Sequence, residues 1–383
     1  MISQPIRPMR LVVGGILDLR DIVGRDRLAG QICGQLTTGD GVLLTGDRRI
    51  GKTTLSRLVE ARLRSEGHPV IRVSAERSSY DDFARALADQ VRHETASRFA
   101  AELDQWQLGI RAGPVDLTRE PTNPSLDRLI QIAIESASKR PVFIVDEVPV
   151  LARAMEQAAR GSGTAMLHTL RRVRQENSGR ASMLLLGSIG FHHVSAEATG
   201  TVNDVVKQSA GPISAEDAAY LARCLILGEG VDTSDEAAVA TAIADAAEGV
   251  PYYVQHLVAS CRNDAAITIT PEDIPRLVDS ALTHPDDPWN MRHYRDRIPL
   301  YYGDDQADLV SAVIDVYADE QGLLSVDSAL RLVHSQPSGG DLSRGDLVGL
   351  VEKLEQDHYL ERSGNDSRFR SELVRRAWLA TRR

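Results

Sequence analysis

The residues that first suggest chemistry form a loop, Gly46-Asp47-Arg48-Arg49-Ile50-Gly51-Lys52-Thr53. The loop follows the apolar run 42–44 and precedes residues 55–59, whose apolar side chains recur at helical spacing, so it would join a strand to a helix. Its glycines let the backbone turn sharply and approach a ligand, while consecutive N–H groups and the positive end of the following helix attract an anion. The pattern predicts the phosphate-binding loop of a nucleotide site, and the alternative is an ordinary glycine-rich turn.

Two residues of this loop have distinct expected roles. Lys52 would reach the β- and γ-phosphates, and Thr53 would offer its hydroxyl to Mg²⁺. ATP and Mg²⁺ are therefore the expected cofactors. We predict nucleotide contacts for the whole loop and the next residue, namely Gly46, Asp47, Arg48, Arg49, Ile50, Gly51, Lys52, Thr53 and Thr54.

Two adjacent carboxylates, Asp146 and Glu147, follow the apolar run 142–145. Such a run indicates a strand buried on both faces, and ligands of open α/β sheets bind at the carboxyl ends of strands. Asp146 would hold Mg²⁺, directly or through water, and Glu147 would orient or deprotonate the attacking water. The alternative is a plain polar turn, and the phosphate loop upstream favours the functional interpretation.

A serine and two arginines are further candidates. Ser188 follows the apolar run 183–186, so its hydroxyl would lie near the γ-phosphate and sense it, with a turn cap as the alternative. Arg171 or Arg172, on a predicted helix over 166–175, would act as an arginine finger, with a solvated helix face as the alternative. The catalytic candidates are Glu147, Lys52, Ser188, Arg171 and Arg172.

The composition is that of a globular protein of more than one domain. The chain has 383 residues, which is too long for one ordinary hydrophobic core. Hydrophobic residues make up 42% of it and charged residues 26%, a composition that excludes a largely disordered chain. Only 4% are aromatic, so the core must consist mostly of Leu, Val, Ile and Ala, as in helices packed on a parallel sheet. A net charge of −10 argues against coating nucleic acid by bulk electrostatics.

The cysteines and the ends of the sequence indicate the compartment. Cys33, Cys224 and Cys261 are widely spaced, which fits a reducing environment and no zinc site. No stretch resembles a transmembrane span or a signal peptide, so we expect a cytoplasmic protein without a membrane partner.

The order of the elements predicts three domains. Strand-like runs end before residue 211, and helices alone follow from residue 214, so we place a P-loop core at 1–210 and a helical lid at 211–290. A β-hairpin at 106–118 would be inserted in the core. Residues 291–383 would form three helices and a small hairpin, the outline of a winged helix-turn-helix.

Direct DNA binding by this last domain stays open. Its third helix, 343–357, would carry the base-reading side chains, but it contains Asp346, Glu352 and Glu355. The predicted wing and the tail helix are basic. A contact with a protein or with the rest of the chain is therefore favoured over duplex DNA.

Together these residues resemble the archaeal-type ATPases of the STAND and AAA+ branch of P-loop proteins, which are related to origin-recognition initiators. The resemblance covers nearly the whole chain and is sharpest in the phosphate loop, in Val23-Gly24-Arg25, in Phe143-Ile144-Val145-Asp146-Glu147 and in Gly249-Val250-Pro251. It implies an α/β fold with a P-loop NTPase parallel sheet, an all-α lid and a winged helix-turn-helix domain. It also implies that Val23 and Gly24 lie against adenine, and that Pro251 packs on the nucleotide. No arginine stands next to Gly249-Val250-Pro251, where AAA+ lids usually carry one.

These observations predict an ATP-dependent switch that hydrolyses ATP slowly and couples nucleotide state to self-assembly or to a protein effector, as in mobile-element or antiviral defence. One alternative is a DNA-binding initiator or transposition regulator that assembles on DNA. Another is a non-hydrolysing ATP-bound scaffold for an effector.

Overall fold

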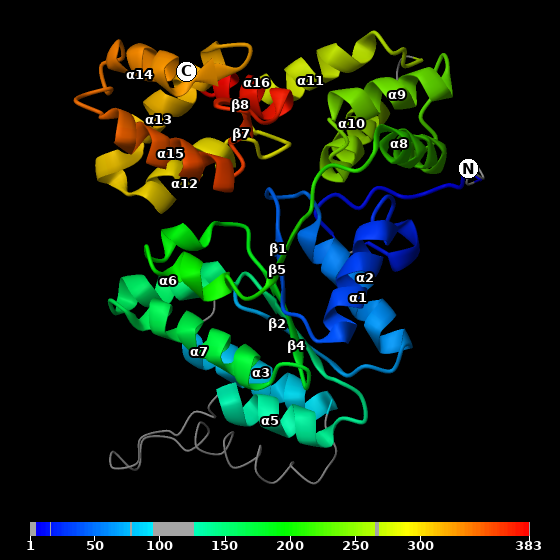
Figure 1. The fold of residues 1–383 in the computed structure, drawn as a ribbon. Helices are drawn as coiled ribbons and strands as arrows, with labels where there is room; N and C mark the ends of the chain where they lie inside the picture. The colour runs from blue at the N-terminus through cyan, green and yellow to red at the C-terminus, as the bar shows by residue number, and fades with distance from the viewer. Residues whose placement is uncertain (1–4, 16, 77–78, 95–125, 265–267, 383) are drawn as a thin grey trace, which may run out of the picture. The chain divides into compact units, whose positions relative to one another are not determined.

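The computed structural model describes residues 5–15, 17–76, 79–94, 126–264 and 268–382 (Figure 1). The chain divides into two compact units. We call Arg25–Arg48 together with Lys52–Ala210 the sheet unit. We call Met1–Gly24, Arg49–Gly51 and Gly211–Arg383 the helical unit.

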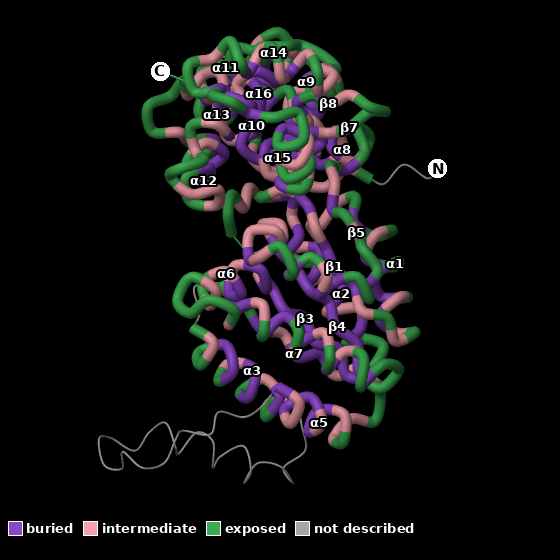
Figure 2. The backbone as a smooth tube through the Cα atoms, turned by 60° about the vertical axis from the view of Figure 1, so that its left-hand side comes forward, coloured by how far each residue is buried: buried purple, intermediate pink, exposed green. Residues whose placement is uncertain are grey.

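The sheet unit is built on five parallel strands in the order β2-β3-β4-β1-β5. The strands are β1 (Val42–Thr45), β2 (Val70–Ser74), β3 (Val142–Asp146), β4 (Ser182–Leu186) and β5 (Val206–Ser209). The three central strands are almost wholly buried, as Figure 2 shows, because helices cover both faces of the sheet. The predicted α/β fold with a parallel sheet is confirmed.

Helices cover the sheet in two groups (Figure 1). One face holds α1 (Asp26–Thr38) and α2 (Lys52–Ser65). The other face holds α3 (Tyr80–Glu94), α5 (Leu126–Ser136), α6 (Val148–Ala158) and α7 (Ser162–Glu176). Alternate strand residues such as Leu43, Phe143 and Leu185 enter the core under this second group, as the two-residue period of a strand requires.

The helical unit begins with residues that the sequence had assigned to the P-loop core. The Met9 N–H donates to the Cys224 carbonyl at 2.9 Å, and the Leu11 N–H donates to the Glu229 carboxylate at 3.0 Å. Gly228 permits this approach, since a β-carbon there would lie 1.7 Å from the Met9 carbonyl oxygen. The described residues before Arg25 therefore pack with the described residues after Ala210, which differs from a core over 1–210.

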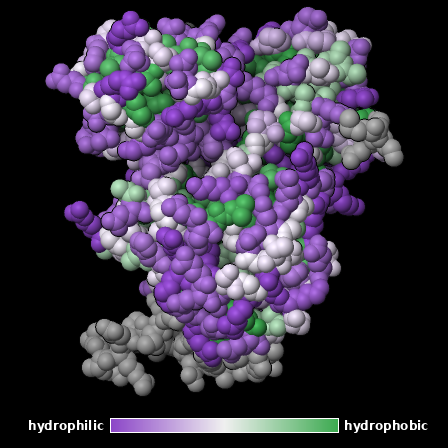
Figure 3. All heavy atoms as spheres, viewed as in Figure 1, coloured by the Kyte–Doolittle hydropathy of each residue, from purple (hydrophilic) through white to green (hydrophobic). Residues whose placement is uncertain are grey.

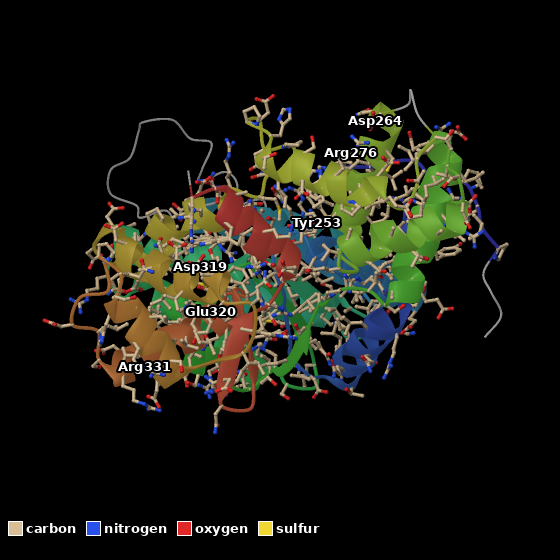
Figure 4. The ribbon with its side chains drawn as sticks, turned by 90° about the horizontal axis from the view of Figure 1, so that it is seen from above. Tyr253, Asp264, Arg276, Asp319, Glu320 and Arg331 are labelled. Carbon is tan, nitrogen blue, oxygen red and sulfur yellow. The ribbon has the colours of Figure 1, made fainter. Side chains whose placement is uncertain are left out.

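Five helices form the first part of the remaining helical unit: α8 (Ala215–Glu229), α9 (Glu236–Ala246), α10 (Pro251–Asn263), α11 (Asp273–Thr283) and α12 (His293–Tyr302). Ser214 and Asp235 cap α8 and α9 with their side chains, which satisfies N–H groups of the first turn. Arg276 of α11 pairs with Asp264, which follows α10, at 2.8 Å (Figure 4). The helices predicted for this stretch are observed in the described residues, together with one isolated parallel bridge between Thr233 and Ile269.

The last part of the helical unit places helices before a small antiparallel sheet of order β6-β8-β7. Along the chain the elements are α13 (Asp304–Asp319), β6 (Leu324–Ser325), α14 (Val326–His334), α15 (Arg344–Gln356), β7 (Leu360–Ser363), β8 (Asp366–Phe369) and α16 (Glu372–Ala380). Trp378 of α16 is buried, and its indole N–H donates to Asp315 at 2.6 Å. The tail helix is therefore part of this core and not a free basic extension.

Three further sequence expectations concern a β-hairpin, membrane-spanning helices and the cysteines. The predicted hairpin at 106–118 lies outside the described residues. No helix among the described residues combines the length and the apolar composition needed to cross a membrane, and the face of the molecule in Figure 3 is mostly hydrophilic with small hydrophobic groups. All three cysteines are free and buried, and burial raises the pKa of the Cys33 thiol to about 11.

Candidate functional site

The phosphate loop curls around the side chain of Lys52. Gly46 and Gly51 have φ angles of 147° and 97°, which suit glycine and allow the turn between β1 and α2. The Lys52 ammonium donates to the Gly46 carbonyl at 2.8 Å and to the Asp47 carbonyl at 2.9 Å. These bonds hold a positive charge inside the loop, at the amino end of α2, where both the charge and the helix dipole favour an anion.

Thr53 and Asp146 meet beside this loop. The Thr53 hydroxyl donates to Asp146 Oδ2 at 3.1 Å, and only 8% of the Asp146 surface is exposed. Thr53 is in the first turn of α2, and Asp146 is the last residue of β3. Their oxygens are of the kind that Mg²⁺ prefers, so the donor set fits the metal that we expected there.

Glu147 and Ser188 also meet, at the ends of the neighbouring strands β3 and β4. Ser188 donates to Glu147 Oε2 from its backbone N–H at 2.9 Å and from its hydroxyl at 2.8 Å. Glu147 has φ 58° and ψ 38°, a left-handed conformation that is unusual for a residue with a side chain and is concentrated at functional sites. The sequence placed Ser188 near the γ-phosphate, whereas its observed partner is the carboxylate of Glu147.

Arg72 and Gly187 support the site and were missed by the sequence analysis. Arg72 of β2 donates to the Ser56 hydroxyl at 2.6 Å and to the Thr53 carbonyl at 3.5 Å, which ties the start of α2 to the sheet. Burial lowers the pKa of its guanidinium, although the charges of nearby acidic groups oppose that shift. A β-carbon on Gly187 would lie 2.6 Å from Pro149, so glycine lets the end of β4 approach α6. The signal that could have identified Arg72 is its charge, since it is the one charged residue among the apolar residues of 70–73.

The two arginine-finger candidates are occupied elsewhere in the sheet unit. Arg171 donates to the Gly200 carbonyl at 2.9 Å, and its Nε lies 3.8 Å from Asp204. Arg172 pairs with Asp127 at 2.9 Å and with Glu176 at 3.3 Å. The structure does not bring either guanidinium to Glu147 or Lys52 of the same chain.

Val23 and Gly24, which the resemblance assigned to adenine, and Pro251, which it assigned to the nucleotide, lie in the helical unit. Gly24 has φ 71°, and a β-carbon there would lie 2.9 Å from the Ile213 side chain. The Ile213 N–H donates to the Gly249 carbonyl at 2.9 Å, two residues before Pro251 opens α10. Val23 is partly buried against the same core. Ile213 therefore joins the segment predicted to contact adenine to the segment predicted to pack on the nucleotide, a link that the sequence did not reveal.

Comparison with known families identifies the part of the chain that contains the catalytic candidates. Residues 36–194 match the model of the family described as an AAA domain. This part of the chain is an AAA-type P-loop ATPase domain. The AAA domain includes the phosphate loop, Asp146, Glu147 and Ser188, so the predicted membership in this class is confirmed.

Individual proteins with similarity to the chain are more distant. It is 28% identical over 190 residues to the DNA repair protein RadA of Brucella abortus, over 49% of this chain and 34% of RadA, so it spans about a third of that relative. The Walker-type ATPase PABY2304 of Pyrococcus abyssi has a similar fold, with a TM-score of 0.62 and 16% identity over 98% of this chain and 99% of that one. The ORC2 protein of Aeropyrum pernix has a TM-score of 0.48 at 14% identity, over 93% of each chain.

Proposed function

We propose that the protein is an ATP-binding, slowly hydrolysing AAA-type switch that couples its nucleotide state to assembly or to the binding of a protein partner. The observation that carries the proposal is the convergence of Lys52, the Thr53–Asp146 pair and the Glu147–Ser188 pair at the carboxyl edge of one parallel sheet. A cation inside a glycine loop at a helix amino end binds phosphates, and the adjacent carboxylates serve a metal and a water.

Each residue has one task in this proposal. Thr53 and Asp146 would hold Mg²⁺, which neutralises charge on the phosphates when it is bound. Glu147 orients the attacking water, and Ser188 fixes the orientation of the Glu147 carboxylate by its two hydrogen bonds. Lys52 stabilises the negative charge that develops on the transferred phosphoryl group.

Slow turnover follows from the positions of Arg171 and Arg172. An arginine finger raises the rate of phosphoryl transfer by roughly 10³ to 10⁵. Both guanidiniums form ion pairs away from Lys52 and Glu147, so neither assists hydrolysis in its own chain. A nucleotide that persists between turnovers suits a switch better than a motor.

Hydrolysis and mass measurements test the proposal. We expect the wild type to bind ATP with Mg²⁺, hydrolyse it slowly and change its mass or its retained partners relative to the ADP state, by light scattering and pull-down. Glu147→Gln should bind ATP but hydrolyse it at least about 100-fold more slowly, whereas Glu197→Gln, on an exposed residue of the same unit, should match the wild type. If ATP stays intact for hours and Glu147→Gln behaves like the wild type, the scaffold alternative replaces the switch.

The DNA-binding alternative has less support because acidic side chains pair with several arginines of the last elements. These pairs are Arg344–Asp327, Arg362–Glu355, Arg368–Glu361, Arg376–Asp279 and Arg382–Asp319. A neutralised guanidinium contributes little to phosphate binding. Duplex DNA binding with a steep salt dependence, and assembly only when DNA is present, would nevertheless favour the initiator.

A further inference from the structure

Arg49 lies in the phosphate loop and has an unfavourable backbone conformation. Its φ angle is 67°, in the left-handed region that glycine adopts freely and that a residue with a β-carbon avoids. Arg49, Ile50 and Gly51 belong to the helical unit, whereas Arg48 and Lys52 on either side belong to the sheet unit. A strained residue persists only where other contacts determine its conformation, so the contacts of its side chain are informative.

The Arg49 guanidinium binds two segments of the helical unit. Nη1 donates to the Trp289 carbonyl at 2.7 Å and to the Tyr252 hydroxyl. The guanidinium carbon lies 4.5 Å from the centre of the Tyr252 ring, within the range of a cation–π interaction. Tyr252 is in the first turn of α10, and Trp289 lies between α11 and α12.

The two residues that Arg49 contacts belong to a cluster of aromatic rings, which we define as Tyr252, Tyr253, His256 and Trp289. The Tyr252 and His256 rings are 4.3 Å apart, and the rings of Tyr253 and His256 lie 6.0 Å and 6.1 Å from that of Trp289. Figure 4 labels Tyr253 on α10. Trp289 is 1% exposed and belongs to the same buried core as Tyr253. Burial and the Arg49 charge lower the pKa of His256 to about 4, so the cluster presents a neutral imidazole to the guanidinium.

The Trp289 carbonyl is also held in place by its own turn. The Asp287 carboxylate accepts from the Met291 N–H at 2.7 Å and from the Arg292 N–H at 2.9 Å. Asp287 and Asn290 have φ angles of 44° and 50°, so the turn is tightly wound around Trp289. Arg49 therefore binds a rigid acceptor, and a change in the conformation of its backbone must break or strain these contacts.

We propose that Arg49 is a positioning residue that couples occupancy of the phosphate loop to the Tyr252–Tyr253–His256–Trp289 cluster. This inference rests on the proposed function, because phosphate binding by the loop supplies the signal. A nucleotide that orders the loop selects one conformation of Arg49 and so stabilises its contacts with the cluster. By reciprocity, loss of the cluster weakens nucleotide binding. Here an arginine of the phosphate loop contacts α10. In AAA+ lids the arginine usually belongs to the lid and reaches the phosphate, and no such arginine stands beside Gly249-Val250-Pro251.

Fluorine NMR of the full chain labelled with 5-fluorotryptophan tests this coupling. The chain contains three tryptophans, and Trp106→Phe and Trp289→Phe assign their signals. We expect saturating ATP with Mg²⁺ to shift the Trp289 signal of the wild type. In Arg49→Gly, which tolerates the φ angle but lacks the guanidinium, the Trp289 shift should disappear at saturation, and Arg49→Lys should retain part of it. Arg180→Gly makes the same change at an exposed arginine of the sheet unit that lies outside the phosphate loop, and it should keep the full shift.

A second variant protects the test against loss of binding. If calorimetry shows that Arg49→Gly no longer binds ATP, Tyr252→Leu removes the aromatic ring and the hydroxyl acceptor with the loop intact, and should bind ATP without the Trp289 shift. An unchanged Trp289 shift in saturated Arg49→Gly or Tyr252→Leu overturns the inference. If the wild type binds ATP and its Trp289 signal does not shift, the inference is also wrong, but the proposed function is unaffected. A wild type that binds no ATP by calorimetry removes both.

Discussion

Ser188 donates both its backbone N–H and its hydroxyl to a single oxygen of Glu147, at 2.9 Å and 2.8 Å. The second carboxylate oxygen is thereby given a fixed direction, since the carboxylate cannot rotate without breaking both bonds. Glu147 also begins α6 in a left-handed conformation, so its backbone and its side chain are both constrained. The orientation of the predicted base is therefore set by the neighbouring strand.

Removal of the Ser188 hydroxyl should slow hydrolysis without weakening nucleotide binding. One hydrogen bond of about 1 kcal/mol is lost in Ser188→Ala, so we expect kcat for ATP to fall roughly 5- to 10-fold with KM nearly unchanged. Steady-state kinetics measures both parameters. Ser188→Thr keeps the hydroxyl and should retain most of the activity. A rise in KM with an unchanged kcat would instead show that Ser188 contacts the nucleotide.

A methyl group at the contact between α6 and α7 should destabilise the AAA domain. In Gly163→Ala the new β-carbon would lie 1.9 Å from the Ala152 carbonyl oxygen, so the helices must separate. Overpacking of this kind costs about 1–3 kcal/mol or more, which denaturant unfolding measures. Gly34→Ala in α1 meets no atom within 4 Å and should be neutral or slightly stabilising. Equal stability of the two variants would contradict the packing described for α6 and α7.

The stability of the helical unit should decrease in mild acid because of His256. Its pKa falls from 6.5 to about 4 on folding, mainly through burial, so the unfolded chain binds the proton more tightly. Stability is unaffected above pH 6.5, falls as the pH decreases from 6.5 to 4, and loses roughly 3 kcal/mol from this group. Denaturant unfolding across this pH range measures the loss. His256→Phe should remove that part of the pH dependence, and an identical slope in both proteins would refute the assignment.

Sequence patterns were sufficient for the buried part of the fold. The runs 42–44, 142–145 and 183–186 predicted β1, β3 and β4, because strands covered on both faces must be continuously apolar. β5 was not predicted, because it is a short edge strand whose Val206 and Lys207 are exposed. α6 was not predicted, because its first residues, Val148-Pro149-Val150-Leu151, are apolar like the strand before them.

The sequence predicted the residue types of the site better than their partners. The fixed spacing of the loop motif identified Lys52 and Thr53. The hydrogen bonds between Ser188 and Glu147 depend on β4 lying beside β3, and no local sequence pattern predicts that strand order. Arg49 was expected to contribute to the loop only. Its partners Tyr252 and Trp289 are 203 and 240 residues away in the chain, and only the tertiary fold brings them to its guanidinium.

Nucleotide binding at the phosphate loop can be measured by calorimetric titration of ATP with Mg²⁺ into the purified protein. We expect stoichiometric binding by the wild type and by Lys207→Ala, which removes an exposed lysine of β5. Lys52→Ala, which removes the ammonium held by the Gly46 and Asp47 carbonyls, should lose at least about 100-fold in affinity, as expected for a charge-assisted contact. Equal affinity of Lys52→Ala and Lys207→Ala, or no binding by the wild type, would contradict nucleotide binding at this loop.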